Sequence, residues 1–459
     1  MVSDEIESDH GYHQRSIMIS SHRMFIAALT LYATVSYAIL HNVHNAVHTV
    51  IDEEFHIPQG MAYCNFNISA WNRKITTLPG LYIVSTILLG PLRLCGTYWL
   101  RFVSFLAGII NTYLFSILFG VFDQKIGDRE KLEGLLSAFN LSILPPLFFF
   151  TNLYYTDVVS ITFVLLLLIL NRANRHVLAS VCGLFSVIVR QTNIIWVGML
   201  FVDYILKQVK AEDASSFRID SVQNVEKRIK NASNRILVDV GSYVSVMSAF
   251  VIFLIVNQGI AVGDRSAHTT VVHIPQLFYF STFCLIFAWP HFLHLIVPFV
   301  KYFYKKGPPY TISAMAIVAI IVRANTLVHP YLLADNRHYT FYVWKRFYEN
   351  MPLFRYAVIP VYLFGLYSLV CSVRSRNDVT FALAYLPCTA FVLVLQKMIE
   401  VRYFLTPFLI FRTNIRQRSM KLLLAESLTY LTMNIVAFTI FFTKNIYWND
   451  YPYIQKLIW

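Results

Sequence analysis

Long apolar runs and short polar stretches alternate over almost the whole chain. Runs of about 17 to 25 residues recur, and such runs are long enough to cross the roughly 30 Å hydrocarbon core of a bilayer as helices. The pattern predicts spans at 24–40, 99–121, 137–151, 155–170, 177–189, 194–206, 239–259, 277–299, 310–328, 355–372, 378–396, 401–411 and 425–443, about thirteen in all. Several are shorter than the ~20 residues of a straight crossing, so we expect them to be tilted, kinked or buried among neighbours. The stretch 81–92 is either a short interfacial helix or a further span.

The composition agrees with this pattern. Apolar residues make up 57% of the 459 residues and charged residues 14%, whereas an ordinary soluble domain is roughly 25% charged. The sequence therefore predicts an all-α polytopic membrane protein. The run 24–40 is not followed by a small-residue cleavage site, so it is interpreted as an uncleaved signal anchor behind a polar N-terminal tail, 1–23. Residues 24–459 are predicted to form one polytopic domain.

The net charge of +13 is carried mostly by short loops between apolar runs. In a soluble protein this charge would suggest nucleic-acid binding, but here it follows the positive-inside rule, which places basic loops in the cytosol. The basic loops are 125–131, 171–176, 207–235, 301–309, 374–376 and 412–421. The polar islands then emerge on the opposite side, at 51–77, 154–157, 190–193, 257–276, 329–350 and 396–403. A shared face predicts one shared site.

Two adjacent carboxylates, Asp52 and Glu53, follow the first apolar run. Ionisable groups at the edge of a bilayer are expensive and often functional. If this stretch is helical, Asp52, His56 and Gln59 lie along one face, where a carboxylate could take a proton from a hydroxyl. The alternative is an interfacial helix that carries solvated polar residues.

The island 329–346 is the densest in polar and aromatic residues. Asp335, Asn336, Arg337 and His338 stand in a row among aromatics, which suits recognition of a sugar hydroxyl and an anion together. The other interpretation is a loop whose charges pair with each other.

Arginines interrupt the apolar pattern at two further islands. Arg402 either binds phosphate or pairs with Glu400, because unpaired charges are costly there. Arg190 lies at the mouth of a helical hairpin or caps helix carbonyls. Near Asp264 and Arg265, two glycines permit a tight chain reversal. The chain has no P-loop and no Rossmann fingerprint, which favours a lipid carrier over a nucleotide as the donor of any transferred group.

Cysteines, histidines and sequons add less. Cys64 and Cys95 are the one pair that could meet outside the membrane, and no disulfide is predicted from them. The stripe of His41, His44 and His48 is interpreted as surface polar residues in preference to a metal site. Sequons occur at Asn67, Asn140 and Asn231, of which only Asn67 is expected on the side of the polar islands.

Seven strings, in order over nearly the whole chain, carry a family resemblance: DEEFHIPQ, ITTLPGLY, LYYTD, RQTNIIW, GDRSAHTTVVHIPQLFYF, YLLADNRHYTFYVWKR and EVRYFLTP. They resemble the terminal α-1,2-glucosyltransferases of asparagine-linked glycan assembly, which are similar to the multi-spanning GT-C glycosyltransferases. The resemblance implies transfer of glucose from dolichyl phosphate glucose to a diglucosylated, dolichyl-diphosphate-linked oligosaccharide. It also implies a multi-pass protein of the endoplasmic reticulum membrane whose site faces the lumen, with 41–98 as the first lumenal loop and 207–238 as a cytosolic loop.

A β-linked donor and an α-linked product imply inversion, hence one displacement with one carboxylate as the base. The base of such enzymes tends to lie in the first lumenal loop, which Asp52 matches, with Glu53 as its rival. For the donor phosphate the order of preference is Arg402, then Arg337 and His338, then Arg190. The remaining candidates for substrate binding are His56, Gln59, Trp71, Asp157, Gln191, Asn193, Asp264, Arg265, Asp335, Asn336, Tyr339, Glu400 and Tyr403. No cofactor is predicted, and dependence on a divalent metal is left open.

Two positions depart from the usual family pattern. Val50-Ile51 stands where an aromatic-Met pair is usual, and Asn72-Arg73 stands where Asp-Pro is usual. The second departure argues against an essential carboxylate at position 72. A transporter or channel-associated protein is the alternative class, but transporters carry charges near the bilayer midplane and often paired repeats. Here the charges lie on one face, which favours an enzyme.

Overall fold

The computed structural model describes residues 2–215, 222–265, 271–374, 379–415, 419–448 and 451–459. Within these ranges the chain forms helices joined by loops, with isolated bridges between His338 and Ile458 and between Ile446 and Gln455. The longer helices are α1 (Val2–Ala46), α2 (Glu53–Cys64), α3 (Gly80–Leu89), α4 (Thr97–Leu118), α5 (Asp128–Ser142), α7 (Thr156–Arg172), α8 (His176–Val189), α9 (Ile194–Ser215), α10 (Val222–Asn257), α11 (Pro275–Phe292), α12 (Ile296–Lys306), α13 (Pro308–Asn325), α17 (Ile359–Arg374), α18 (Val379–Val394), α19 (Leu405–Arg412) and α20 (Met420–Thr443). The short elements are α6 (Pro145–Phe150), η1 (Gln191–Asn193), η2 (Leu293–Leu295), α14 (Pro330–Ala334), α15 (Tyr339–Val343), η3 (Trp344–Glu349), α16 (Phe354–Ala357) and η4 (Val401–Phe404).

The predicted fold class, an all-α polytopic membrane protein, is confirmed. Six segments of the described chain are long and apolar enough to cross a membrane: His22–Ala46, Thr97–Leu118, Ile236–Asn257, Pro275–Lys306, Phe354–Arg374 and Met420–Thr443. The count of thirteen spans is not confirmed, because the other helices are either too short or not apolar enough to qualify as spans. The domain boundaries at 23 and 24, and the loops 41–98 and 207–238, stay predictions.

Prolines explain why two predicted spans are divided. The span 137–151 is broken between α5 and α6, where Pro145 and Pro146 supply no backbone N–H to continue the helix. In the span 277–299, Ala288 leaves helical geometry two residues before Pro290, and the chain continues through a short 3-10 turn into α12. Each break therefore divides one predicted span into two shorter helices.

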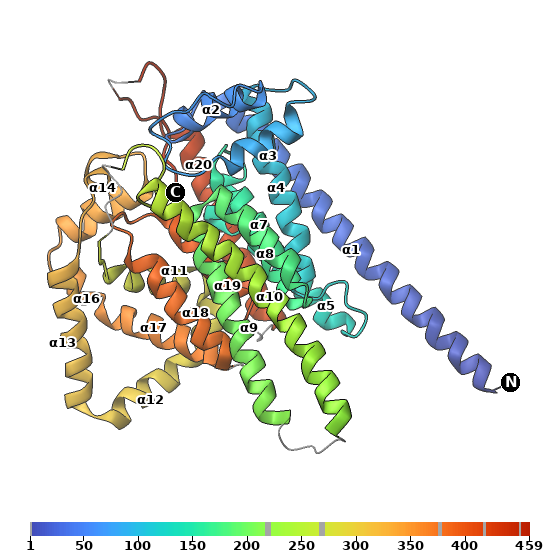
Figure 1. Ribbon diagram of the computed structural model, residues 1–459. Coiled ribbons are helices and arrows are strands. Elements are labelled where there is room, and N and C mark those ends of the chain that lie inside the picture. The colour runs from blue at the N-terminus through green and yellow to red at the C-terminus, as the bar shows by residue number, and fades with distance from the viewer. Residues whose placement is uncertain (1, 216–221, 266–270, 375–378, 416–418, 449–450) are drawn as a thin grey trace.

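The core of the bundle is aromatic. α7 packs between α4 and α8, and Gly80 at the start of α3 lies so close to the backbone of Ile188 and Val189 that any side chain would clash. Phe283 and Phe287 on α11 contact Phe408 on α19. This packing gathers the ends of α7, α8 and α18 at the end of the bundle that α2 and α3 cover (Figure 1).

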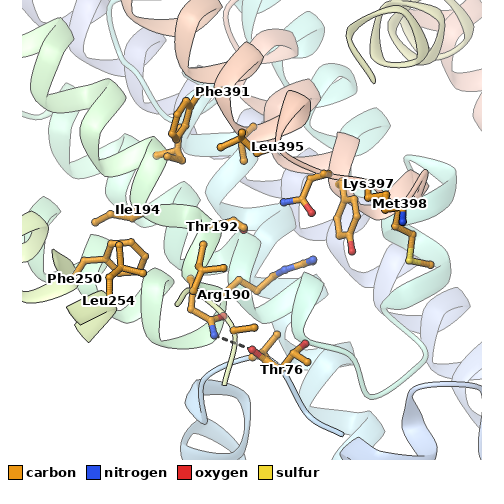
Figure 2. Close-up of a pocket in the computed structure, with 18 of the residues that line it drawn as sticks. Thr76, Arg190, Thr192, Ile194, Phe250, Leu254, Phe391, Leu395, Lys397 and Met398 are labelled. Atoms are coloured by element: carbon orange, nitrogen blue, oxygen red, sulfur yellow. Dashed lines mark hydrogen bonds between the residues drawn. The ribbon is translucent and has the colours of Figure 1, made fainter. Parts of the chain in front are cut away.

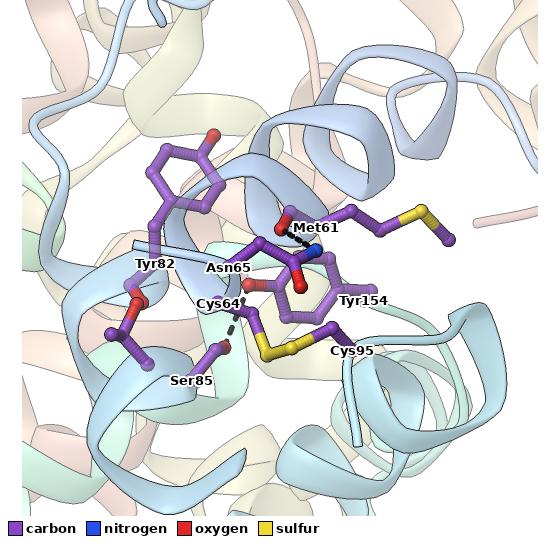
Figure 3. Close-up of a disulfide and its surroundings, with 8 residues drawn as sticks. Met61, Cys64, Asn65, Tyr82, Ser85, Cys95 and Tyr154 are labelled. Carbon is purple, nitrogen blue, oxygen red and sulfur yellow. Dashed lines mark hydrogen bonds between the residues drawn. A yellow bond between two sulfur atoms is a disulfide. The ribbon is translucent and has the colours of Figure 1, made fainter. Parts of the chain in front are cut away.

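A disulfide joins Cys64, the last residue of α2, to Cys95, just before α4, with Cα atoms 5.6 Å apart (Figure 3). The sequence identified this pair as the one able to meet but did not predict the bond. Beside it, the hydroxyl groups of Ser85 and Tyr154 form a hydrogen bond of 2.7 Å. The disulfide therefore ties the end of α2 to the start of α4 and encloses α3 in the loop between them.

Candidate active site

Five charged side chains meet at the end of the bundle beside α2. Asp52 immediately precedes α2, Asp157 lies in the first turn of α7, and Arg190 follows α8. Arg402 lies in η4, and Glu400 is the N-cap of that element. We call these five residues the Arg402 cluster. The structure thus brings together residues from four of the predicted polar islands.

Arg402 lies at the centre of the cluster. Its Nη2 is 2.8 Å from Asp52 Oδ2 and its Nη1 is 3.6 Å from Asp157 Oδ2, and it also pairs with Glu400. Its guanidinium lies 4.9 Å from the ring centroid of Tyr155. Asp157 also pairs with Arg190, so one carboxylate connects the two arginines. Arg402 is thus already surrounded by three carboxylates.

A tight turn presents Asp52. Ile51 has a positive φ of 47°, the backbone N–H of Asp52 donates to the Tyr155 hydroxyl at 3.1 Å, and that hydroxyl donates to Val50 O at 2.8 Å. The Asp52 side chain is 36% exposed, whereas those of Asp157 and Glu400 are 1% and 5% exposed. Asp52 is therefore the carboxylate of the cluster that a substrate hydroxyl can reach.

Glu53 points the other way and is fully buried. Arg101 donates to it through Nε at 2.9 Å and Nη2 at 2.6 Å, and the backbone N–H groups of Tyr154 and Val50 donate at 2.7 Å and 3.1 Å. A carboxylate held by four donors and shielded from solvent cannot act on a substrate, so the geometry speaks against Glu53 as a rival base. Sequence reasoning missed Arg101, although a lone arginine inside an apolar run was a usable signal.

The charges around Asp52 keep it ionised. Burial alone would raise the pKa of its carboxyl, but Arg402, His56 and His338 hold that pKa below its ordinary value of 3.8. Burial lowers the pKa of His56, whereas Asp52 acts in the opposite direction. A hydrogen bond of 2.6 Å joins His56 Nδ1 to the Tyr82 hydroxyl. His56 also donates its backbone N–H to Asp52 O at 3.0 Å, one helical turn away.

A pocket of about 460 Å³ lies next to the cluster (Figure 2). Arg190 enters it, with Ile194, Phe250 and Leu254 on one flank and Lys397 and Met398 on the other. Its polar lining also includes Thr76, Thr77, Gln191, Thr192, His329, Tyr331, Gln396 and Tyr403. The Arg190 guanidinium lies 6.0 Å from the Tyr403 ring centroid. The pocket thus combines two cations with apolar walls from α9 and α10.

The island 335–338 is paired with the protein itself. Arg337, 7% exposed at its side chain, donates to Asp335 Oδ1 at 2.8 Å and Oδ2 at 2.7 Å, and stacks 4.1 Å from the Trp448 ring centroid. Asn336 accepts from Trp448 Nε1 at 2.8 Å. These contacts favour the internally paired loop that the sequence left open and leave Arg337 poorly placed as a phosphate ligand.

The remaining predicted residues lie around these features, several in structural contacts. Gln59 holds the 70–72 turn, donating to Ala70 O at 2.6 Å and accepting from Asn72 N at 2.8 Å. Gln191 donates to Thr76 O at 2.9 Å. Asn193 bridges helices through Ser160 Oγ at 2.7 Å, Arg265 donates to carbonyls in the loop after α10, and Asp264 N donates to Arg73 O at 2.7 Å. Trp71 and Tyr339 each carry a buried polar atom without a hydrogen-bond partner, Nε1 and Oη.

Among the residues that the structure describes, no group of three or more His, Cys, Asp or Glu side chains is placed to hold a metal ion. In the histidine stripe, His44 packs against Tyr98 and His48 against Tyr453. Asn140, one of the three sequon asparagines, is fully buried and donates to Glu426 Oε2 at 3.0 Å.

Comparisons with known proteins agree with one another. Residues 46–413 match the DIE2/ALG10 family. A Drosophila melanogaster protein named Dol-P-Glc:Glc(2)Man(9)GlcNAc(2)-PP-Dol alpha-1,2-glucosyltransferase is 38% identical over 425 residues, which cover 89% of this chain and 93% of that protein. Proteins of the same name from Homo sapiens and Arabidopsis thaliana are 33% and 28% identical, over 89% and 95% of this chain and 93% and 100% of theirs. No solved structure matches the chain significantly.

Proposed function

Because the chain belongs to the DIE2/ALG10 family, we propose that it transfers glucose from dolichyl phosphate glucose in α-1,2 linkage onto the diglucosylated, dolichyl-diphosphate-linked oligosaccharide. This is the activity that the names of its relatives state. The transporter alternative is not favoured. The observation that supports this activity at the Arg402 cluster is a partly exposed carboxylate, Asp52, next to a pocket that has apolar walls and is lined by Arg190 and Lys397.

Asp52 is the general base. The acceptor 2-hydroxyl attacks C1 of the donor glucose, its proton passes to an Asp52 oxygen, and the C1–O bond to the dolichyl phosphate breaks. The released phosphate keeps the bonding electrons, so cations stabilise its charge and no general acid is required. Two features support this role: Asp52 is the most exposed carboxylate of the Arg402 cluster, and its lowered pKa keeps it deprotonated at neutral pH.

Arg190 and Lys397 hold the donor phosphate. Both line the pocket, and a phosphate that bridges them would lie beside walls formed by Ile194, Phe250 and Leu254, which can bury the isoprenoid chain. Phe391 on α18, another lining residue, is 55% exposed, so the pocket reaches the lipid-facing surface. Arg190 thus replaces Arg402 as the preferred phosphate ligand.

Arg402 is the residue that holds the base. Its three carboxylate partners already compensate its charge, and an incoming phosphate would be repelled by them. Its contact with Asp52 Oδ2 fixes the carboxylate and keeps it ionised. The sequence alone favours Arg402 as the phosphate ligand, whereas its contacts support a role in orienting Asp52.

The protein is a multi-pass membrane protein, and we place it in the endoplasmic reticulum with the Arg402 cluster facing the lumen. Two independent features support this orientation. The basic loops of the sequence lie opposite the polar islands. The Cys64–Cys95 disulfide lies in the predicted lumenal loop 41–98, which also contains Asp52, and disulfides persist in oxidising compartments, to which the lumen belongs.

The test is glucosyl transfer by the purified protein in detergent, from synthetic dolichyl phosphate glucose to the diglucosylated lipid-linked acceptor. Asp52→Asn is expected to lower kcat by about 10²–10⁴-fold, with donor binding and thermal stability retained because the side chain keeps its shape. Asp123→Asn, an exposed carboxylate in a loop after α4, is the matched control. Normal turnover by Asp52→Asn would refute the assignment of the base, and an inactive wild type would refute the proposed function.

A further inference from the structure

The chain after α20 folds back into the bundle. We call its two described stretches, 444–448 and 451–459, the C-terminal segment. Ile458 is fully buried and belongs to the main core, and Leu457 is 3% exposed. In Figure 1 this segment rises beside α2 and returns to the interior. It lies outside residues 46–413, the part of the chain that matches the family.

One side of the segment binds the island 335–339. Ile458 N donates to Arg337 O at 2.8 Å, and Tyr339 N donates to Ile458 O at 3.1 Å, so the two strands of chain pair around His338. Trp448 donates to Asn336 and stacks on Arg337. Residues 335–338, which the sequence suggested for binding a sugar and an anion, therefore form the surface that the C-terminal segment binds.

The other side of the segment binds the turn that carries Asp52. The Tyr453 hydroxyl donates to Glu54 Oε2 and accepts from Thr49 Oγ1 at 2.8 Å. Thr49 and Glu54 flank Asp52 in the sequence by three and two residues. Burial, with the hydrogen bond to Glu54 acting in the same direction, raises the pKa of Tyr453 to about 12, so the hydroxyl stays protonated and can donate.

The segment thus contacts both the 335–339 loop and the turn that carries Asp52. His338, whose Nδ1 lies 3.2 Å from Trp459 O, is also one of the groups that lower the pKa of Asp52. We propose that the C-terminal segment is a positioning element of the active site, which holds the 335–339 loop and the Asp52 turn at a fixed separation for the acceptor oligosaccharide. This inference rests on the proposed function and adds a part of the chain to its site.

The alternative is that the segment only anchors the end of α20. Disrupting a mere anchor would lower the melting temperature and would change the kinetic constants for donor and acceptor to the same extent. A positioning element acts on the acceptor and on kcat, because the residues that the segment binds, 336–339 together with Thr49 and Glu54, do not line the donor pocket. The two roles therefore differ in which kinetic constant changes.

The experiment compares Trp448→Leu and Tyr453→Phe with Tyr447→Leu and Tyr447→Phe in the full chain, using the transfer assay. Tyr447 is 76% exposed and supplies a control for each substitution. We expect kcat/KM for the acceptor to fall about tenfold or more in Trp448→Leu and Tyr453→Phe, since small displacements of reacting groups are known to cost up to ~10²-fold. Donor KM and melting temperature are expected to stay near wild type in Tyr453→Phe, and both Tyr447 variants should match wild type.

A double-mutant cycle locates the effect at the contact. If Tyr453 acts through Glu54, then Tyr453→Phe with Glu54→Gln should lose little more activity than either single variant. The positioning role is overturned if kcat/KM for the acceptor stays within twofold of wild type in both Trp448→Leu and Tyr453→Phe. It is also overturned if kcat/KM falls equally for donor and acceptor and the fall follows the loss in melting temperature. An inactive wild type would instead overturn the proposed function, and the inference with it.

Discussion

The ion pair between Glu53 and Arg101 should be one of the strongest stabilising contacts next to the active site. Both side chains are 0% exposed, and Arg101 supplies two of the four hydrogen bonds that Glu53 accepts. Arg101→Met keeps the apolar stem but removes the charge, which leaves a buried carboxylate with only two backbone donors. Breaking such a pair from one side typically destabilises by about 3–5 kcal/mol.

The measurement is reversible or kinetic unfolding of the purified protein in one detergent, followed by intrinsic fluorescence. Arg129→Gln is the matched control, because Arg129 is 82% exposed in its pair with Glu133 and surface pairs contribute about 0–1 kcal/mol. The double variant Arg101→Met with Glu53→Leu should recover much of the loss, since replacing both partners of a buried pair by apolar residues is often close to neutral.

The same double variant tests the assignment of the base. If Asp52 is the base and Glu53 is structural, the double variant should retain turnover whenever it remains folded. The reasoning is refuted if Arg101→Met is no less stable than Arg129→Gln, or if the double variant is as stable as wild type and yet inactive.

Three further predictions follow from the site. Arg190→Gln should raise the KM for dolichyl phosphate glucose at least tenfold and change the acceptor KM little, measured by initial rates with each substrate varied. Arg402→Gln removes the cation that holds the pKa of Asp52 below 3.8; the acid limb of kcat/KM should therefore move to higher pH, because the base becomes protonated earlier as pH falls. Cys64→Ser with Cys95→Ser should destabilise the protein by about 3–4 kcal/mol for a loop of 31 residues, and reductant should affect the wild type but not this variant in thermal unfolding.

The sequence predicted which residues would come together better than it predicted what each would do. Loop charge alone placed the islands of Asp52, Asp157, Arg190 and Arg402 on one side, and the structure brings these four side chains into one cluster. This part of the site depends on membrane topology, which the apolar runs and the charges of the loops between them indicate directly.

The choice between Asp52 and Glu53 depends on a contact that spacing does not reveal. Adjacent residues at the start of a helix point in different directions, and Arg101, which captures Glu53, lies 48 positions away within a spanning helix. In the same way, Trp448, which donates to Asn336, and Gln455, which accepts from Arg337, lie more than 110 positions downstream in the C-terminal segment. Only a folded structure shows that a polar row is already occupied.

Inversion gives a geometric reason to separate the base from the cation that receives the phosphate. In a single displacement the attacking oxygen and the leaving oxygen lie on opposite faces of the sugar ring. A phosphate bound by Arg402 would lie against Asp52, 2.8 Å from that guanidinium, on the same side as the base and next to a like charge. Arg190 reduces both problems, because it pairs with one carboxylate, Asp157, where Arg402 pairs with three, and because it lines the pocket with Lys397. The proposed roles therefore require the glucose ring to bind between Asp52 and Arg190, with the acceptor on one face of the ring and the lipid phosphate on the other.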